Sequence, residues 1–325
     1  MIVALDTGSH REGRAVMFEA APKELLIHIG AQKTASALLR RTAASLKPEL
    51  ADAGLYLMTR SEVSAAPFHD YIHRMNLGQL SRHDQVPQDV ARSLSEVVNR
   101  PEPRVLIMSE SLFSRLPLES FFQNVSESLA FLRDEWAPHR LRLILYVRRQ
   151  PSFIVSCYAQ FISMGRTFSF DEFTGGDLPD HLNWHTVCSD ISSVIGRENL
   201  IVRPYEMIGQ SGAVGYAKDF LETVGLDASL AERAGEIAAR GAKSNRGLSQ
   251  PAIEIARAGN AVLPAKERLK LRKFLQNTFS TATHAKPDFW SPEQEADLKE
   301  HYASSNGALF REFMPDRDPV ALGYV

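Results

Sequence analysis

The chain has 325 residues, of which 44% are hydrophobic and 23% charged, so it has the composition of an ordinary globular protein rather than a disordered or collagen-like one. Its 37 lysines and arginines against 39 aspartates and glutamates give a formal charge of −2, which leaves no global positive field to attract nucleic acid or an anionic membrane. No apolar run reaches the roughly 18 residues of a membrane span, and two cysteines are too few for a disulfide framework or a zinc cluster. We therefore expect a cytoplasmic protein with no transmembrane segment and no nucleic-acid partner, in which any anion-binding site is local.

The first part of the chain predicts an α/β sheet. Residues 1–22 show no sustained period and are expected to form a loose N-terminal arm. Apolar, β-branched runs then predict buried parallel strands at Glu24–Gly30, Arg104–Ser109, Arg142–Val147 and Asn199–Arg203. Helical patterns at residues 34–46 and 151–163 alternate with these strands. The alternation predicts a central parallel sheet wound by right-handed crossovers.

From about Gly225 the strand-like runs stop. Three helical segments are expected there, at Gln250–Ala258, Ala265–Phe279 and Ser291–Met314. The simplest organisation is one domain over residues 23–325, with an α/β core to about 230 and a helical C-terminal portion, about 240–325, packed on the sheet.

The passage from the first strand into the first helix, residues 28–37, is the first functional signal. Unpaired amides and the helix dipole make a helix N-terminus attractive to phosphates, and Gly30 allows a sharp turn that aims those amides at a ligand. Lys33 adds a full positive charge, while Thr34 and Ser36 offer hydroxyl donors. The alternative is that Gly30 merely turns the chain, Lys33 is solvated and Thr34 caps the helix.

This loop differs from a nucleoside-triphosphate P-loop. That motif places a glycine immediately before the lysine and another five positions earlier, where this chain has Gln32 and Ile27. No later strand ends in the aspartate that would hold magnesium. We therefore expect an anion to bind without a metal.

A second strand-to-helix passage, residues 142–156, supplies an arginine and a serine. Arg148 and Arg149 end the strand, Pro151 starts the helix, and Ser156 follows Arg148 by eight residues. A guanidinium beside a hydroxyl suits a phosphate monoester, because it donates two parallel hydrogen bonds and stays charged. A surface arginine pair with a solvated serine is the alternative.

Together these two motifs resemble the sulfotransferase superfamily, which uses 3'-phosphoadenosine 5'-phosphosulfate. The residues around them are Ile-His-Ile-Gly before the lysine and Val-Arg-Arg-Gln-Pro in the second passage. They look most like the bacterial branch of the superfamily, which acts on carbohydrate or lipid-linked acceptors. The resemblance spans roughly residues 24–314 and implies a P-loop-like three-layer fold. It also implies that the first loop holds the 5'-phosphosulfate and that the second motif holds the 3'-phosphate. The implied donor-binding residues are Gly30, Gln32, Lys33, Thr34, Ala35, Ser36, Ala37, Arg148 and Ser156.

Two positions depart from the family pattern. Ala35 stands where the family has glycine, which matters if the backbone there needs a positive φ. Ala37 stands where the family has a second threonine, and the loss of that hydroxyl is expected to weaken the binding of the donor nucleotide by about 0.5–1.5 kcal/mol.

Sulfuryl transfer needs a group that neutralises the leaving phosphate and a base that takes the acceptor's proton. We assign the first role to Lys33. Glu110 follows a strand and is the first candidate base, with burial expected to raise its pKa; it could instead cap the next helix or pair with Arg115. His69 and His73 share a helix face and compete for the role, but with no third ligand we expect them at the surface or in the substrate groove rather than on a metal.

A late basic loop is the weakest part of the predicted site. Lys243, Asn245 and Arg246 could close over the nucleotide, since family members have a basic, glycine-containing loop late in the chain; a solvated loop is the alternative. Two other functions stay open. One is a nucleotide-dependent phosphotransferase, and the other is a non-catalytic nucleotide-binding module, which Ala35 and Ala37 favour.

Overall fold

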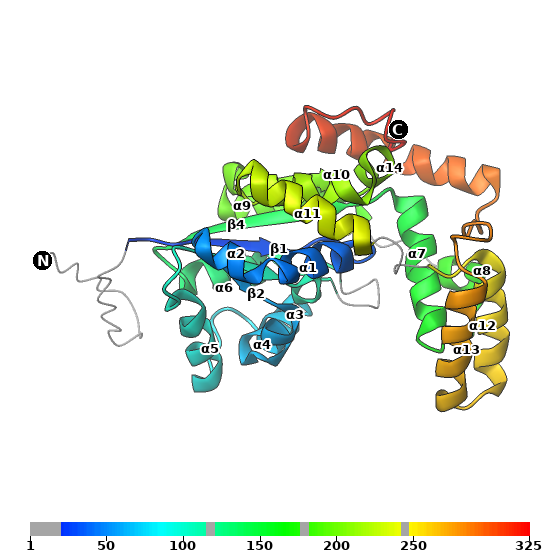
Figure 1. The fold of residues 1–325 in the computed structure, drawn as a ribbon, viewed down its shortest axis with the longest axis horizontal. Coiled ribbons are helices and arrows are strands. Elements are labelled where there is room, and N and C mark those ends of the chain that lie inside the picture. Colours follow the sequence, from blue (N-terminus) through cyan, green and yellow to red (C-terminus); the bar gives the residue numbers. More distant parts are fainter. Residues whose placement is uncertain (1–20, 115–120, 176–181, 242–246) are drawn as a thin grey trace, which may run out of the picture.

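The computed structural model describes residues 21–114, 121–175, 182–241 and 247–325, and Figure 1 shows their arrangement. Five strands form one sheet in the order β2-β3-β1-β4-β5, and every neighbouring pair is parallel. The strands are β1 (Glu24–His28), β2 (Leu55–Met58), β3 (Arg104–Met108), β4 (Arg140–Val147) and β5 (Leu200–Pro204). The predicted α/β fold with a central parallel sheet is confirmed.

Helices cover both faces of the sheet and make a three-layer α/β fold (Figure 1). One face is covered by α1 (Ser36–Ser45), α2 (Lys47–Asp52), α10 (Met207–Thr223) and α11 (Ala228–Gly241). The other side carries α3 (Arg60–Ala65), α4 (Pro67–Asn76), α5 (Gln88–Val98), α6 (Val125–Glu135), α7 (Gln150–Ser163), α8 (Phe170–Thr174) and α9 (Trp184–Ile195). The chain ends in α12 (Gln250–Val262), α13 (Ala265–Thr278) and α14 (Pro292–Phe313).

Alternation along β1 builds two cores. Leu25 and Ile27 join the core on the α4–α9 side, while Leu26 belongs to the core under α1, α10 and α11. His28, on the same face of the strand as Leu26, has no exposed surface and packs against the rings of Tyr146 and Phe220. Because successive side chains of a strand point to opposite faces, the apolar run of β1 fills both layers at once.

The C-terminal helices pack differently from the prediction. We expected them on the sheet, but α12 packs on α7, and α14 packs on α9 and α7. The two faces of the sheet are already covered by the helices that precede them. The hairpin of α12 and α13 therefore lies at one end of the molecule (Figure 1). None of the described helices is long and apolar enough to cross a bilayer.

Candidate anion-binding site

The loop between β1 and α1 presents a run of main-chain amides with no partner. Ile29 and Ala31 still donate to β4, at 3.0 Å each, and so continue the sheet. From Gln32 to Ala37, no amide donates to an acceptor within the described residues. A helix N-terminus of this kind is a ready site for an anion, because its unpaired N–H groups and the helix dipole both favour negative charge.

The loop adopts backbone conformations that side chains rarely take. Lys33 and Ala35 have φ of 72° and 58°, and Ala35 is the N-cap of α1 with no side-chain hydrogen bond. Ala35 therefore has the left-handed backbone conformation that glycine adopts most easily. Glycine is the residue that the sequence pattern discussed above has at this position. Gly30 has a different role, because a Cβ there would lie 3.0 Å from Thr34 Oγ1 and 3.2 Å from His28 Nε2.

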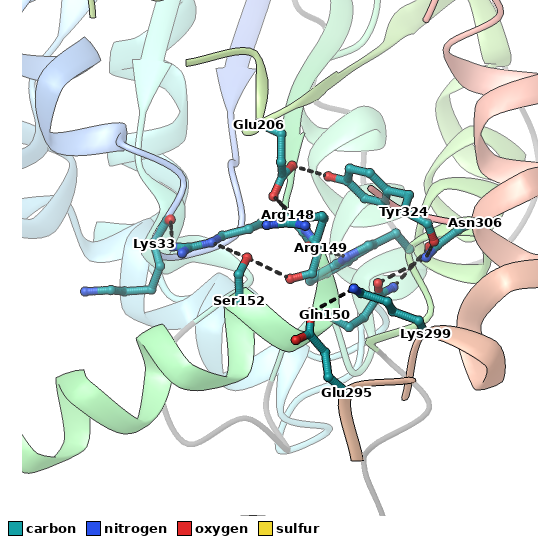
Figure 2. A network of polar contacts seen from close by, with 11 residues as sticks. Lys33, Arg148, Arg149, Gln150, Ser152, Glu206, Glu295, Lys299, Asn306 and Tyr324 are labelled. Atoms are coloured by element: carbon teal, nitrogen blue, oxygen red, sulfur yellow. Dashed lines mark hydrogen bonds and ion pairs between the residues drawn. The ribbon is translucent and has the colours of Figure 1, made fainter. Parts of the chain in front are cut away.

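Arg148 reaches this loop from the end of β4. Its Nη1 donates to the main-chain oxygen of Lys33 at 2.8 Å, and its Nε donates to Ser152 Oγ at 3.0 Å (Figure 2). Its guanidinium lies 4.6 Å from the ring centroid of Tyr205. Within the part of the chain that the structure describes, Nη2 makes no hydrogen bond, so one donor edge of a held guanidinium is left for a ligand.

Helix α7 presents one polar face to both anchors. Ser152 accepts from Arg148, and Gln160 Oε1 accepts from Lys33 Nζ at 3.4 Å. Ser156 lies between them, since residues four apart share a helix face. Ser156 is half-buried and forms no hydrogen bond with the described residues. The structure thus brings Lys33, Arg148 and Ser156 to one place.

Three cations gather here without a counter-charge. Burial lowers the pKa of the Lys33 ammonium, and the positive charges of Arg148 and of Arg272 on α13 lower it further. Among the described residues, none of these three side chains forms an ion pair. Like charges held together repel unless an anion neutralises them, so the electrostatics favour a ligand with several negative charges.

Three residues near this site, Arg272, Ser152 and Gln160, are not among those predicted from the sequence. Ser152 and Gln160 could have been found from the four-residue spacing that links them to Ser156 on a helix. Arg272 lies in a segment distant in sequence, and it comes near Lys33 because α12 packs on α7 and α13 packs on α12.

A buried polar network holds the C-terminal segment behind Arg148. The Arg149 amide and the Tyr324 hydroxyl both donate to Glu206, at 3.1 and 2.7 Å. Gln150 and Asn306 exchange hydrogen bonds at 3.1 and 3.2 Å (Figure 2). These contacts fix the turn from β4 into α7 and therefore the direction in which Arg148 points.

Glu110 is ion-paired with Arg40 of α1. Burial alone would raise the pKa of Glu110, but the charge and hydrogen bond of Arg40 hold it below its ordinary value of 4.5. The expectation of a raised pKa for Glu110 is therefore wrong, because the counter-charge of Arg40 on the neighbouring helix outweighs the effect of burial. His28 lies close enough to feel both charges, and burial lowers its pKa from 6.5 to about 4.

His69 and His73 are both buried in α4, with 7% and 8% of their surface exposed. The expectation of a surface position is wrong, because α4 packs against the short helix η1 (Glu110–Leu112), whereas a place in the substrate groove stays a prediction. His69 Nε2 lies 2.8 Å from Ser111 Oγ, next to Glu110. The imidazole of His69, on α4, thus contacts the residue that follows the Glu110 carboxylate in the chain.

The other predicted donor-binding residues of this loop make contacts within the protein or lie partly buried. Thr34 is fully buried and its hydroxyl donates to Ala31 O at 2.7 Å, so it shapes the loop instead of facing a ligand. Ser36 is also buried, 3.5 Å from the Thr34 hydroxyl. Gln32 donates to Ser114 O at 2.5 Å, and Ala37 lies half-buried in the first turn of α1. Lys243, Asn245 and Arg246, like nearly all of the expected N-terminal arm, lie outside the described residues.

The chain matches no family model and no curated protein. Among solved structures it is similar to the crystal structure of a sulfotransferase from Alicyclobacillus acidocaldarius, with 14% sequence identity and a TM-score of 0.49. The match covers 93% of this chain and 99% of that one. Within the described residues, no group of three or more histidine, cysteine, aspartate or glutamate side chains is placed to hold a metal.

Proposed function

We propose that this protein is a sulfotransferase that takes a sulfuryl group from 3'-phosphoadenosine 5'-phosphosulfate and passes it to a hydroxyl, or an amine, of a carbohydrate or lipid-linked acceptor. The observation that carries the proposal is the contact between the two anchors, in which Arg148 donates to the main chain of Lys33. It joins a run of unpaired amides to a cluster of unpaired cations, and a nucleotide with phosphates at both ends fits such a surface.

The donor-binding roles divide along the site. The amides of Gln32–Ala37 and the Lys33 ammonium would hold the 5'-phosphosulfate, while the free edge of Arg148 and the Ser156 hydroxyl would hold the 3'-phosphate. Arg272 adds positive charge near Lys33. Most of the catalysis would come from positioning and electrostatics, as in phosphoryl transfer.

The reaction forms a bond between the acceptor oxygen and sulfur and breaks the bond between sulfur and the bridging phosphate oxygen. Lys33 would neutralise the charge that develops on that bridging oxygen, and its lowered pKa also eases a proton donation to it. The acceptor's proton passes to a base of the protein, and the products are the sulfated acceptor and adenosine 3',5'-bisphosphate.

Glu110 is our first candidate for the base and His69 the second, with His73 behind it. Glu110 is ionised at neutral pH, but its ion pair with Arg40 lowers its proton affinity. The imidazole of His69 contacts Ser111, the residue that follows Glu110, so His69 remains a candidate for the base. The two candidates predict different pH dependence.

Thermal unfolding in the presence of nucleotides tests the proposal. Adenosine 3',5'-bisphosphate should raise the midpoint more than adenosine 5'-monophosphate at equal concentration, because only the first engages both anchors. Equal stabilisation, or none, would contradict the assignment of the 3'-phosphate pocket.

A non-catalytic nucleotide-binding module is the second candidate. It is favoured by the strained Ala35, by the absent hydroxyl at Ala37 and by the engagement of Glu110 with Arg40. Such a module would bind the bisphosphate tightly yet transfer sulfate to none of a panel of carbohydrate and lipid-linked acceptors.

A further inference from the structure

One end of the molecule combines exposed apolar side chains with a cluster of cations. It consists of residues 162–166, the end of α7 and the turn after it, and residues 260–274, the tip of the α12–α13 hairpin with most of α13; we call it the docking end. Asn260 Nδ2 donates to the main-chain oxygens of Ile162 and Arg166, at 2.7 and 2.9 Å, and so ties the two segments together. They therefore form one surface (Figure 1).

The apolar part of the docking end is unusually open to solvent. Val262 at the hairpin tip is 78% exposed, Met164 62%, Leu269 58% and Phe274 55%. Val262 is the most exposed large hydrophobic side chain in the described part of the chain. Single exposed apolar residues are common, but four on two contacting segments mark an interaction surface.

The charge of the docking end is opposite to that of the whole chain. Helix α13 carries Lys266, Arg268, Lys270, Arg272 and Lys273 against the single acid Glu267, and Arg166 lies on the neighbouring turn, while the whole chain has a formal charge of −2. Lys266 and Lys270 are exposed and form no ion pair with the described residues. Long cationic side chains beside apolar ones are the pattern of segments that lie in a membrane interface.

We infer that the docking end binds the surface of an anionic lipid bilayer, with Val262, Met164 and Leu269 entering the headgroup region. Anionic lipids match the positive charge, and the acyl boundary matches the apolar side chains. A second copy of the chain fits less well, since a symmetric contact would bring two sets of five cations together. An acidic peptide would neutralise the lysines, but its charged side chains would not bury the exposed apolar side chains at the hairpin tip.

This surface lies close to the candidate site. Gln160, which accepts from Lys33, precedes Met164 by four residues of helix, or about 6 Å along its axis. Arg272 on α13 is near enough to Lys33 to lower its pKa. A bilayer at the docking end would therefore bring the headgroups of its lipids to the mouth of the site. Resting on the proposed function, this selects a lipid-linked acceptor over a free carbohydrate.

Co-sedimentation with vesicles tests the inference. The full chain should sediment with vesicles of equal parts phosphatidylcholine and phosphatidylglycerol, less so at high salt, and weakly with phosphatidylcholine alone. Val262→Asp should reduce the bound fraction, and the double charge reversal Lys266→Glu and Lys270→Glu should weaken partitioning by about tenfold or more. Both sites are exposed, so the variants should fold, and circular dichroism checks this.

Matched controls lie elsewhere on the surface. Val320→Asp changes another exposed valine, 67% exposed, near the C-terminus, and Arg60→Glu with Arg92→Glu reverses two exposed cations on α3 and α5. Both should bind vesicles like the wild type. Absence of wild-type binding to anionic vesicles would overturn the inference, as would full binding by Val262→Asp. A wild-type dimer that Val262→Asp dissociates in sedimentation velocity would also overturn it in favour of self-association. The vesicle assay needs neither donor nor acceptor, so its outcome is independent of the nucleotide test.

Discussion

Arg148 and Lys33, which lie 115 residues apart in sequence, are joined by a hydrogen bond of 2.8 Å from the guanidinium to the main-chain oxygen. The bond fixes the loop that carries the unpaired amides against the end of β4. It also means that Arg148 can act in two ways, by contacting a ligand or by shaping the loop. Experiments on the site have to separate these roles.

Arg148→Ala should weaken the binding of adenosine 3',5'-bisphosphate by about tenfold to a hundredfold, the value of a charge-assisted hydrogen bond to phosphate. Binding of adenosine 5'-monophosphate should change little, because it lacks the phosphate that Arg148 is proposed to hold. Isothermal titration calorimetry gives both dissociation constants.

The control for this change is the neighbouring Arg149→Ala. Arg149 pairs with Glu206 and not with the loop, so its loss should lower stability without altering selectivity between the two nucleotides. If Arg148→Ala weakened the binding of both nucleotides equally, Arg148 would act by shaping the Lys33 loop, and its proposed role in binding the 3'-phosphate would be wrong.

Ala35→Gly should stabilise the fold. Ala35 has φ 58° and ψ 18°, a conformation that costs an L-residue about 1 kcal/mol relative to glycine. We expect the free energy of unfolding to rise by about 1 kcal/mol in urea denaturation. Ala37→Gly, two residues further in the first turn of α1, should instead lower it by about 0.5–1 kcal/mol. A loss of stability in Ala35→Gly would show that the loop does not hold this conformation in solution.

The sequence predicts the fold well where local patterns decide it. Four of the five strands were found as apolar runs, because parallel strands buried on both faces are continuously hydrophobic. Strand β2 was missed since Leu55–Met58 has only four residues and lies at the sheet edge. Local sequence patterns do not predict how segments distant in sequence pack, as with the C-terminal helices on α7 and α9.

The candidate site, too, is predictable from the sequence in part. The proximity of the first loop to Arg148 follows from strand topology, because parallel strands end at one edge and β1 neighbours β4. The ion pair of Glu110 with Arg40 and the burial of His69 depend on how α1 and α4 dock, and no local pattern reports that. Arg272 likewise reaches the site only through tertiary packing.

The pH dependence of turnover should identify the base. If Glu110 is the base, activity persists at acidic pH and falls only below about 4.5, because the folded pKa of Glu110 is lowered from that value. Arg40→Gln removes the counter-charge but leaves the burial, so it should move this acid limb to higher pH. Glu110→Gln should abolish turnover at every pH.

An imidazole base behaves otherwise. Histidine ordinarily titrates near pH 6.5, and loss of turnover in His69→Gln or His73→Gln with activity retained in Glu110→Gln would move the base to that residue. An acid limb that Arg40→Gln leaves in place would likewise exclude Glu110.

His28 should make the fold acid-sensitive over a defined pH range. Its imidazole is fully buried, its two nitrogens form no hydrogen bond within the described residues, and burial lowers its pKa from 6.5 to about 4. A depressed folded pKa means that the stabilising contribution of the neutral form is complete above pH 6.5 and is lost as the pH falls through 4. The difference amounts to about 3 kcal/mol. His28→Leu, of similar volume, should remove this part of the pH dependence in urea denaturation series, whereas the exposed His83→Leu should keep the wild-type profile. Identical profiles for His28→Leu and the wild type would mean that His28 is solvated or paired in solution.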